Sequence, residues 1–468
     1  MITDFDASSK LPKLGATFAR ANSVSVSVSS SSLVSKTRTM SSGHHSASAS
    51  SEALLSKPFV LKNSRTYIND VNLPYPLPVD LTELHRQSLR TLMLIQLFRV
   101  PVCCPTLTVK PPTKVLEVGC GSGFWSMMCH RYFRNRGHSS VSFTGMDISP
   151  LALSSTSGLR RPDQDMKWRF VQHDIRQTPF PFPNEEFDLI MVKDLSLAIT
   201  NDMQQKLMDE YIRLLSPGGI LEVWESDHTI RLLRPPPPVA PGSSPPATAN
   251  CPNTANASTS TGVAEEETER ASAITMGAYL MSPNTALSAA LNKFLAEYNT
   301  WLTRALELRG ICPVPCTLVG PMLLQESDSL TDVRSCRLVV PFSDVRWEKE
   351  GIGGVQTHAG ASNNSHGHSH GHSHNHNSST SKHRSKGRHH SNRTSSGLSP
   401  GQMALRRTAL MTVIQEIQAL ESVLREVNGK SQDEWDTWMG KMMHDLLQEN
   451  GTSWGECLEI GAWWARKR

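Results

Sequence analysis

Residues 114–125 read KVLEVGCGSGFW, and this stretch decides the fold of the chain. The segment Lys114–Val118 is a short apolar run typical of a buried strand. Glycines at 119, 121 and 123 are typical of a tight turn, and a helix is predicted from Phe124 to Arg136. A strand, a glycine turn and a helix in this order predict the first unit of an α/β fold.

Further strands are predicted downstream, separated by helical or loop sequence. They cover Ser140–Met146, Lys167–Val171, Phe187–Val192 and Ile220–Glu225, and a helix at Met203–Leu215 precedes the last of them. Strands that alternate with helices form right-handed βαβ units and a parallel sheet. The sequence therefore predicts a Rossmann-like, doubly wound α/β fold.

Long parts of the 468-residue chain have a composition that does not support a packed core. They are rich in Ser, Pro, Thr, Asn, Gly or His, and they bury too little apolar area to offset the entropy lost on ordering. We predict disordered segments at 1–60, 234–273 and 351–398. The folded part is then predicted as core at 66–233 and 274–350, a helical lid at 399–456, and a last core strand at 457–468.

Net charge, the length of apolar runs and the cysteine content bear on the partners and the compartment of the protein. The net charge of +4 is too small to indicate nucleic-acid binding, and the longest nearly apolar run, Leu92–Phe98, is too short to span a bilayer. Nine scattered cysteines fit a reducing compartment, so a cytoplasmic or nuclear location is expected. Mitochondrial import is less favoured because Asp4 and Asp6 are acidic.

A run of alternating histidines extends from His366 to His376. Flexible tracts of this kind bind transition metals in solution whether or not the metal has a role. The cysteines do not form pairs at zinc-finger spacing, and buried thiols are their expected state. We therefore assign no metal site from the sequence.

Acidic residues stand at the ends of three successive predicted strands: Glu117, Asp147 and Asp174. Ligands of doubly wound sheets bind at these carboxyl ends. A dinucleotide fingerprint requires a glycine where Phe124 stands, and an ionised Glu117 would repel a pyrophosphate. A ligand with an ammonium and a sulfonium is favoured there instead. The predicted cofactor is S-adenosylmethionine, and an NAD-dependent oxidoreductase is disfavoured.

In this interpretation Asp147 accepts hydrogen bonds from the ribose hydroxyls, and Asp174 faces the adenine amino group. Amides at the helix N-terminus receive the cofactor carboxylate. The alternative is that the glycines serve only packing and the aspartates only cap helices. The predicted cofactor site comprises Glu117, Gly119, Cys120, Gly121, Asp147, Ile148, His173, Asp174 and Lys193.

These residues resemble class I S-adenosylmethionine-dependent methyltransferases, and within them the fungal group that includes velvet-associated regulators of secondary metabolism. The resemblance covers about Pro78–Asp227 and departs at Glu117, where that group more often has Asp. The motif Leu77-Pro78-x-Asp80-x-x-Glu83-x-x-Arg86 resembles a helix that packs over the cofactor in that group. The other matching motifs are GCGSGFW at 119–125, FTGMDISP at 143–150, FDLI at 187–190 and LSPGG at 215–219.

The resemblance implies a seven-stranded, mainly parallel sheet whose last strand, Cys457–Trp464, is antiparallel and follows a strand at Val333–Phe342. An amphipathic helix is predicted at Thr285–Arg309. A longer helix is predicted to open at Ser399-Pro400 and to end at Asn428-Gly429, and a capping box at Ser431 and Glu434 predicts the next one. The helices between strands six and seven would form a lid over the substrate side.

The predicted activity is in-line transfer of a methyl group to an unidentified small-molecule or protein acceptor. A base is needed only if the acceptor is protonated at working pH. Asp194, Glu225, Asp227 and His228 lie at strand ends on the substrate side, and each residue type also serves as a cap or structural group. We name Asp194 and His228 as the candidates. The alternative is a cofactor-binding regulatory protein with little turnover that acts with a protein partner.

Overall fold

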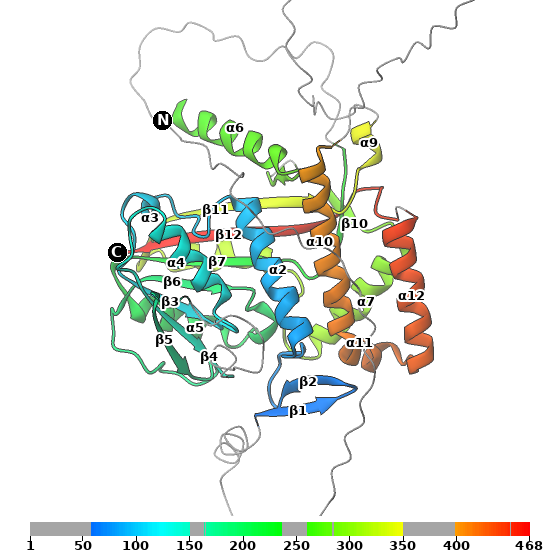
Figure 1. Cartoon of the computed structure of the whole chain (residues 1–468), viewed down its shortest axis with the longest axis horizontal. Helices are drawn as coiled ribbons and strands as arrows, with labels where there is room; N and C mark the ends of the chain where they lie inside the picture. Colours follow the sequence, from blue (N-terminus) through cyan, green and yellow to red (C-terminus); the bar gives the residue numbers. More distant parts are fainter. Residues whose placement is uncertain are drawn as a thin grey trace, which may run out of the picture. The chain divides into compact units, whose positions relative to one another are not determined.

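The computed structural model describes residues 58–149, 163, 165–235, 260–282, 285–349, 398–449 and 451–468. All of them belong to one compact unit, Ser50–Arg468 (Figure 1). Of the segments predicted as disordered, 1–60, 234–273 and 351–398, residues 1–57, 236–259 and 351–397 lie outside the described residues, as does the His-rich run. Phe59 and Val60, at the end of the predicted tail, instead belong to strand β1 (Phe59–Lys62).

The central sheet confirms the doubly wound α/β prediction. Its strand order is β10-β8-β12-β7-β6-β3-β4-β5, and β11 pairs with the other edge of β12. The strand that carries the glycine turn, β3, lies between β4 and β6. From β3 the chain first adds β4 and β5 on one side and then β6 and β7 on the other, so the order in which strands are added reverses at β3. The parallel strands are β3 (Lys114–Val118), β4 (Ser142–Asp147), β5 (Lys167–Gln172), β6 (Phe187–Lys193) and β7 (Leu215–Ser226).

The last strand is antiparallel, as expected. Strand β12 (Glu456–Lys467) pairs antiparallel with β7 on one side and with β11 (Leu330–Pro341) on the other. Three short strands extend this sheet beyond the predicted seven, and a separate hairpin precedes it. They are β8 (Arg231–Leu233), β9 (Tyr279–Leu280) and β10 (Leu287–Ala289), and the hairpin is β1 (Phe59–Lys62) with β2 (Arg65–Ile68).

Helices cover both faces of the sheet (Figure 1). Side chains alternate along each strand, so Leu189 and Met191 pack in one cluster while Ile190 and Val192 pack in the other. The first cluster contains residues of α2 (Leu81–Phe98), α4 (Phe124–Arg134), α7 (Lys293–Glu307), α10 (Pro400–Ala419), α11 (Glu421–Asn428) and α12 (Gln432–Gln448). The second contains residues of α5 (Gln204–Leu214) and α8 (Val319–Gln325).

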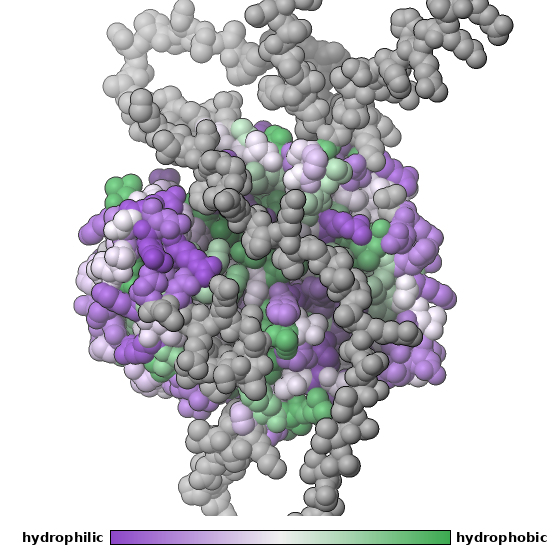
Figure 2. Space-filling view, viewed as in Figure 1, coloured by the Kyte–Doolittle hydropathy of each residue, from purple (hydrophilic) through white to green (hydrophobic). Residues whose placement is uncertain are grey.

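Shorter helices connect these elements. They are α3 (Thr106–Val109), η3 (Ser196–Ala198), η4 (Pro315–Thr317) and α9 (Arg346–Lys349). Among the described helices, no segment has both the length and the apolar character to cross a bilayer. Figure 2 shows apolar side chains at the surface of the β1–β2 hairpin, where Leu61 is 71% exposed.

The capping signals of the lid are confirmed. Ser399 and Ser431 each form a reciprocal capping box, with Gln402 and Glu434 respectively, and thereby start α10 and α12. The predicted long helix ends at Asn428 as expected, but it is interrupted at Leu420, where α10 gives way to α11.

Two predicted elements differ from the structure. The single helix over Thr285–Arg309 is wrong at its beginning, because Leu287–Ala289 pairs with β8 as a strand. Helix α7 begins after Asn292, whose side chain accepts hydrogen bonds from the amides of Phe294 and Leu295. In addition, the predicted insertion 234–273 contains part of a described helix, α6 (Ser260–Thr275).

Candidate active site

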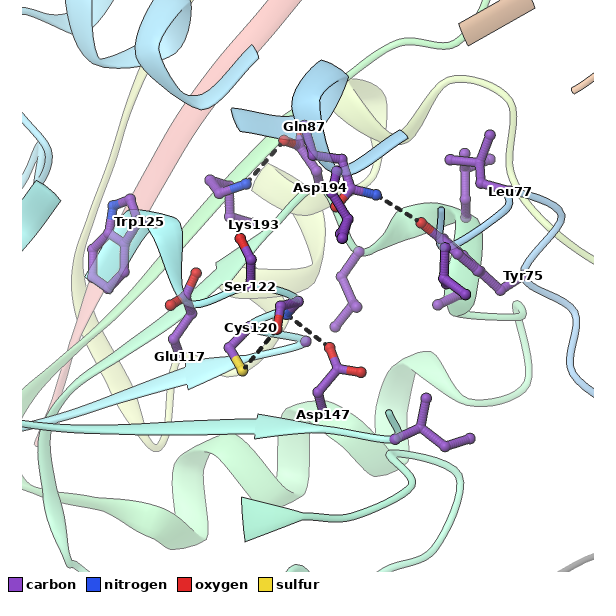
Figure 3. Close-up of a pocket in the computed structure, with 18 of the residues that line it drawn as sticks. Tyr75, Leu77, Gln87, Glu117, Cys120, Ser122, Trp125, Asp147, Lys193 and Asp194 are labelled. Carbon is purple, nitrogen blue, oxygen red and sulfur yellow. Dashed lines mark hydrogen bonds and ion pairs between the residues drawn. The ribbon is translucent and has the colours of Figure 1, made fainter. Parts of the chain in front are cut away.

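A pocket of about 150 Å³ lies at the carboxyl ends of the parallel strands (Figure 3). The structure brings eight predicted cofactor residues together in its lining: Glu117, Gly119, Cys120, Gly121, Asp147, Ile148, Asp174 and Lys193. His173 is not in the lining, and its Nε2 instead pairs with the Gln177 carbonyl at 2.7 Å. Residues that are up to 76 positions apart in sequence therefore meet at one edge of the sheet, as the topology requires.

The glycine turn leads from β3 into α4 with a left-handed backbone. Gly119, Gly121 and Gly123 have φ values of +64°, +52° and +71°, which L-residues with a side chain rarely adopt. A Cβ at position 119 would stand 2.5 Å from Cδ1 of Leu195. The turn therefore keeps backbone rather than side chains at the pocket wall, and a ligand is able to approach it closely.

Glu117 lies beneath this turn and is buried. Its Oε2 accepts hydrogen bonds from Oγ of Ser126 at 2.6 Å and from the Ser126 amide at 3.3 Å, in the first turn of α4. Burial raises the pKa of Glu117 to about 7, although Ser126 and the charge of Lys193 act in the opposite direction. The carboxyl is thus fixed toward α4 while the residue contributes to the pocket wall.

Asp147 ends β4 and is held by backbone amides. Its Oδ2 accepts a hydrogen bond from Gly121 at 2.8 Å, and its Oδ1 accepts one from Ser149 at 3.0 Å. Burial raises the pKa of this carboxyl. A carboxylate oxygen is able to accept more than one hydrogen bond, so both oxygens of Asp147 are able to accept further hydrogen bonds from the hydroxyls of a ligand.

Asp174, after β5, forms an ion pair across the adenine end of the predicted site. Nη2 of Arg176 lies 2.7 Å from its Oδ2, and the same guanidinium also contacts Asp70. Apolar side chains of Ile148 and Ile175 line the adjacent wall. A left-handed glycine turn, acidic groups on two strand ends and this apolar wall fit a ligand with a ribose, an adenine and a charged amino-acid portion.

The other end of the pocket is formed by α2, α10 and the loops after β6 and β7. Arg86 on α2 donates to Glu83 at 2.7 Å and to Glu416 on α10 at 3.0 Å. Arg90, one helical turn further, donates to Asp194 at 3.0 Å and also to Ser226. Both arginine side chains are 5% exposed, so buried guanidinium groups of α2 pair with the lid helix α10 through Glu416 and with the loop after β6 through Asp194.

The two predicted base candidates both line this end, in different electrostatic surroundings. Burial alone would raise the pKa of Asp194, but the charges of Arg90 and Lys193 hold it well below its usual range. A base of such low pKa is a poor proton acceptor at neutral pH. His228 pairs through Nδ1 with Glu416 at 3.2 Å and through Nε2 with Ser196 at 2.9 Å. Of the two candidates, the geometry favours His228.

Sequence reasoning did not identify Arg90, Ser196 or Glu416 as site residues. For Arg90 and Glu416 the only local signal is a charged residue on a helix face that carries apolar residues, as at Glu416 between Ile414 and Ile417, and Ser196 has no such signal. That signal does not show which helix is opposite. Within the described part of the chain, we find no group of three or more His, Cys, Asp or Glu side chains placed to hold a metal ion.

Residues 115–219 match the family model described as "Methyltransferase domain". A demethylmenaquinone methyltransferase of Tropheryma whipplei (strain Twist) is 32% identical over 132 residues, which are 28% of this chain and 49% of that protein. Methyltransferase str3 of Strobilurus tenacellus is 28% identical over 116 residues, which are 25% of this chain and 36% of that protein. The chain thus spans half or less of the length of these curated relatives.

Solved structures give a weaker likeness. N-methyltransferase NodS from Bradyrhizobium japonicum WM9, in complex with S-adenosyl-L-homocysteine, is 22% identical and has a TM-score of 0.22. The alignment covers 32% of this chain and 63% of NodS. The family match and the sheet topology together define residues 115–219 as a methyltransferase domain in a Rossmann-like fold. Helices α7 and α10–α12 and strand β12 lie beyond the matched segment.

Proposed function

We propose that this chain is an S-adenosylmethionine-dependent methyltransferase that acts on an unidentified acceptor. The observation that carries the proposal is the convergence of Glu117, Asp147, Asp174 and the glycine turn on one pocket within the methyltransferase domain. In this assignment Asp147 binds the ribose hydroxyls, the wall of Ile148 and Ile175 packs on the adenine, and the amides of the glycine turn bind the carboxylate.

When bound, the cofactor supplies a methyl group on a sulfonium, so the sulfur keeps the electrons of the breaking bond and no further activation is required. The residues of this chain must align the acceptor and exclude water. Helix α10 serves both purposes in our proposal, because Glu416 closes the pocket against Arg86 on α2 and against His228. The acceptor end is lined by buried residues, and this favours a small molecule over a protein side chain.

The finer assignment, to the fungal velvet-associated group, rests on the motifs GCGSGFW, FTGMDISP and the α2 motif around Arg86. It implies a regulatory protein partner, whereas the proposed cytoplasmic or nuclear location rests on the scattered cysteines. Co-purification of the full chain with a velvet-domain protein tests this partner. If the two proteins elute separately at micromolar concentration, the proposal of a velvet-type partner fails, while the methyltransferase proposal stands.

The experiment that tests the main proposal is calorimetric titration of S-adenosylmethionine and S-adenosylhomocysteine into the full chain. We expect binding by the wild type and its loss in Asp147→Ala. The matched control is Asp209→Ala, which removes an exposed aspartate on α5 and should leave binding unchanged. If the wild type binds neither compound, with NAD titrated in parallel, the proposal fails.

Binding without turnover is the second informative outcome. A screen of small-molecule and protein acceptors with labelled methyl donor follows the titration. Labelled product that is lost in Asp147→Ala supports an enzyme. Tight cofactor binding with no transfer to any acceptor class favours the alternative, a regulatory protein that binds the cofactor with little turnover.

A further inference from the structure

A chain of hydrogen bonds crosses the wall between two cavities. His228 lines the cofactor pocket, whereas Ser196 and Glu225 line a second cavity of about 80 Å³ beneath α5 and α8. Nε2 of His228 lies 2.9 Å from Oγ of Ser196, and that hydroxyl lies 2.8 Å from Oε2 of Glu225. The other ring nitrogen of His228, Nδ1, lies 3.2 Å from Oε1 of Glu416. The four residues come from α10, the loop after β7, η3 and β7.

The donors and acceptors in this chain fix where its hydrogens are. Burial alone would raise the pKa of Glu416, but the charge of Arg86 and the hydrogen bond from His228 lower it to about 2. Glu416 is therefore ionised and only accepts, so Nδ1 of His228 carries a hydrogen. Ser196 has one hydrogen to donate, and both Nε2 and Glu225 are within reach of it.

Before it takes up a proton, the chain has an ionised Glu225 and a neutral His228, and Ser196 donates its hydrogen to one of them. After it has taken up one proton, two arrangements satisfy every contact. In the first, a protonated Glu225 donates to Ser196, Ser196 donates to Nε2, and His228 is neutral. In the second, Nε2–H donates to Ser196, Ser196 donates to an ionised Glu225, and His228 is a cation. The two differ only in the position of one proton along the chain, which Ser196 transfers by accepting one hydrogen while it donates another.

We propose that His228 is the catalytic base of this methyltransferase and that Ser196 passes its proton to Glu225, away from the cofactor pocket. This inference rests on the proposed function. The X–H bond of the acceptor breaks. Its proton binds Nε2 of His228, which gives up its contact with Ser196, and the electron pair of the broken bond forms the new bond between X and the methyl carbon. Nε2–H then returns to Ser196, whose own hydrogen moves to Oε2 of Glu225. Glu416 is a positioning residue that holds the ring tautomer.

The surroundings of the relay suit this transfer. Burial raises the pKa of Glu225 to about 7, and the negative charge of Asp194 adds to the rise. Oε1 of Glu225 is held by the amides of Leu195 and Ser196, both at 2.9 Å, so Oε2 remains for the proton. Other ionisable groups that act electrostatically on the relay are Arg86 and Arg90 through Glu416, and Tyr211 and Cys316 beside Glu225.

The relay defines the class of acceptor. A base with a proton exit is useful only when the nucleophile carries a proton at neutral pH, so the acceptor should be a hydroxyl or phenol. An acceptor that is already nucleophilic, such as a neutral amine or a thioether, gains nothing from His228. This also provides a reason for the hydrogen-bonded connection between two otherwise separate cavities.

The test is NMR of the full chain at neutral pH, labelled with [¹⁵N]histidine and free of cofactor. The His228 signals are assigned by their loss in His228→Gln. We expect the neutral ring to carry its hydrogen on Nδ1. Glu225→Gln should move the ¹⁵N resonance of Nε2, because the hydrogen bond between Ser196 and Nε2 depends on the group that Ser196 contacts on its other side.

A double-mutant cycle separates the relay from a through-space effect. In the Ser196→Ala background, Glu225→Gln should move the Nε2 resonance by less than half as much. Glu222→Gln is the matched control, since it changes another buried glutamate of β7 whose pKa is also about 7 but which bonds to Cys103 and Cys104 on the opposite face. It should leave the His228 resonances unchanged.

Two results would overturn the relay. One is a neutral ring protonated on Nε2, which the wild type alone reveals without any variant. The other is an equal change of the Nε2 resonance in Glu225→Gln with and without the Ser196 hydroxyl. Binding of S-adenosylhomocysteine is measured on the same samples, so a failure of the proposed function shows as absent binding and is distinct from a failure of the relay.

Discussion

The two ends of the pocket are built in different ways. The cofactor end is formed by strand ends, with Gly119, Gly121, Asp147 and Asp174 placed by the turns that follow β3, β4 and β5. The acceptor end joins residues that are far apart in sequence, since Arg86 meets Glu416 across 330 positions. The cofactor end is held mainly by backbone amides, and the acceptor end by buried ion pairs.

This difference has a physical consequence. A parallel sheet fixes where its strand ends lie, so the cofactor end needs few side-chain contacts to keep its geometry. The acceptor end depends on charges that must be paired once α2 and α10 bury them. Variants at the two ends should therefore fail in different ways, and the following measurements separate them.

The largest effect is expected for Arg86→Met. The variant leaves the buried carboxylates of Glu83 and Glu416 without their guanidinium, and loss of one partner of a buried pair costs about 3–5 kcal/mol. Urea unfolding of the variant and of the control Arg407→Met, an exposed arginine of α10, measures this loss. Equal stability of both variants would contradict the contrast between the two ends.

The second prediction concerns pH and has opposite signs at the two ends. The folded pKa of Glu117 is about 7 against an ordinary 4.5, so its relative contribution is present below pH 4.5 and is lost as pH rises to 7. The folded pKa of Glu416 is about 2, so its contribution is present above pH 4.5 and is lost as pH falls toward 2. Each amounts to roughly 3 kcal/mol.

Urea titrations at a series of pH values, on the wild type, Glu117→Gln and Glu416→Gln, measure these contributions. The difference in unfolding free energy between wild type and Glu117→Gln should fall between pH 4.5 and 7. The difference for Glu416→Gln should instead fall as the solution is acidified below pH 4.5. Slopes of the same sign would show that the two carboxyls have similar environments.

A smaller effect is expected for cofactor affinity in Asp147→Asn. Hydrogen bonds to a charged group contribute about 2 kcal/mol, so affinity for S-adenosylhomocysteine should fall roughly thirtyfold. Calorimetry measures this affinity, and the midpoint of urea unfolding checks that the fold is retained. An unchanged affinity would show that Asp147 does not contribute to cofactor binding.

The smallest effect is expected at the start of α12. Ser431→Ala removes the side-chain oxygen that accepts from the amide of Glu434, and such a cap contributes about 1 kcal/mol. Thermal unfolding should show a small loss of stability, while affinity for S-adenosylhomocysteine should not change. A large loss of affinity would mean that the lid also shapes the cofactor end.

Much of the fold was predictable because its signals are local. Strands β3 to β6 were placed within two residues, since a buried parallel strand is a short apolar run bounded by turn residues. The capping box at Ser431 was identified from residue spacing alone, and the helix start at Ser399 from the Ser-Pro pair. The start of α7 was missed because Leu287–Ala289 fits a helical apolar pattern as well as a strand, and only its pairing with β8 decides between them.

Local sequence patterns predicted the doubly wound sheet, the glycine turn and the carboxylates at its strand ends, because strand alternation places all of them without knowledge of distant contacts. The contacts that build the acceptor end follow only from tertiary packing. No regular spacing in the sequence relates Glu416, Arg86, His228 and Ser196. Their relative positions follow from how α10 packs on α2 and on the core. Long-range packing of this kind depends on the shape of two assembled surfaces, which no local pattern encodes.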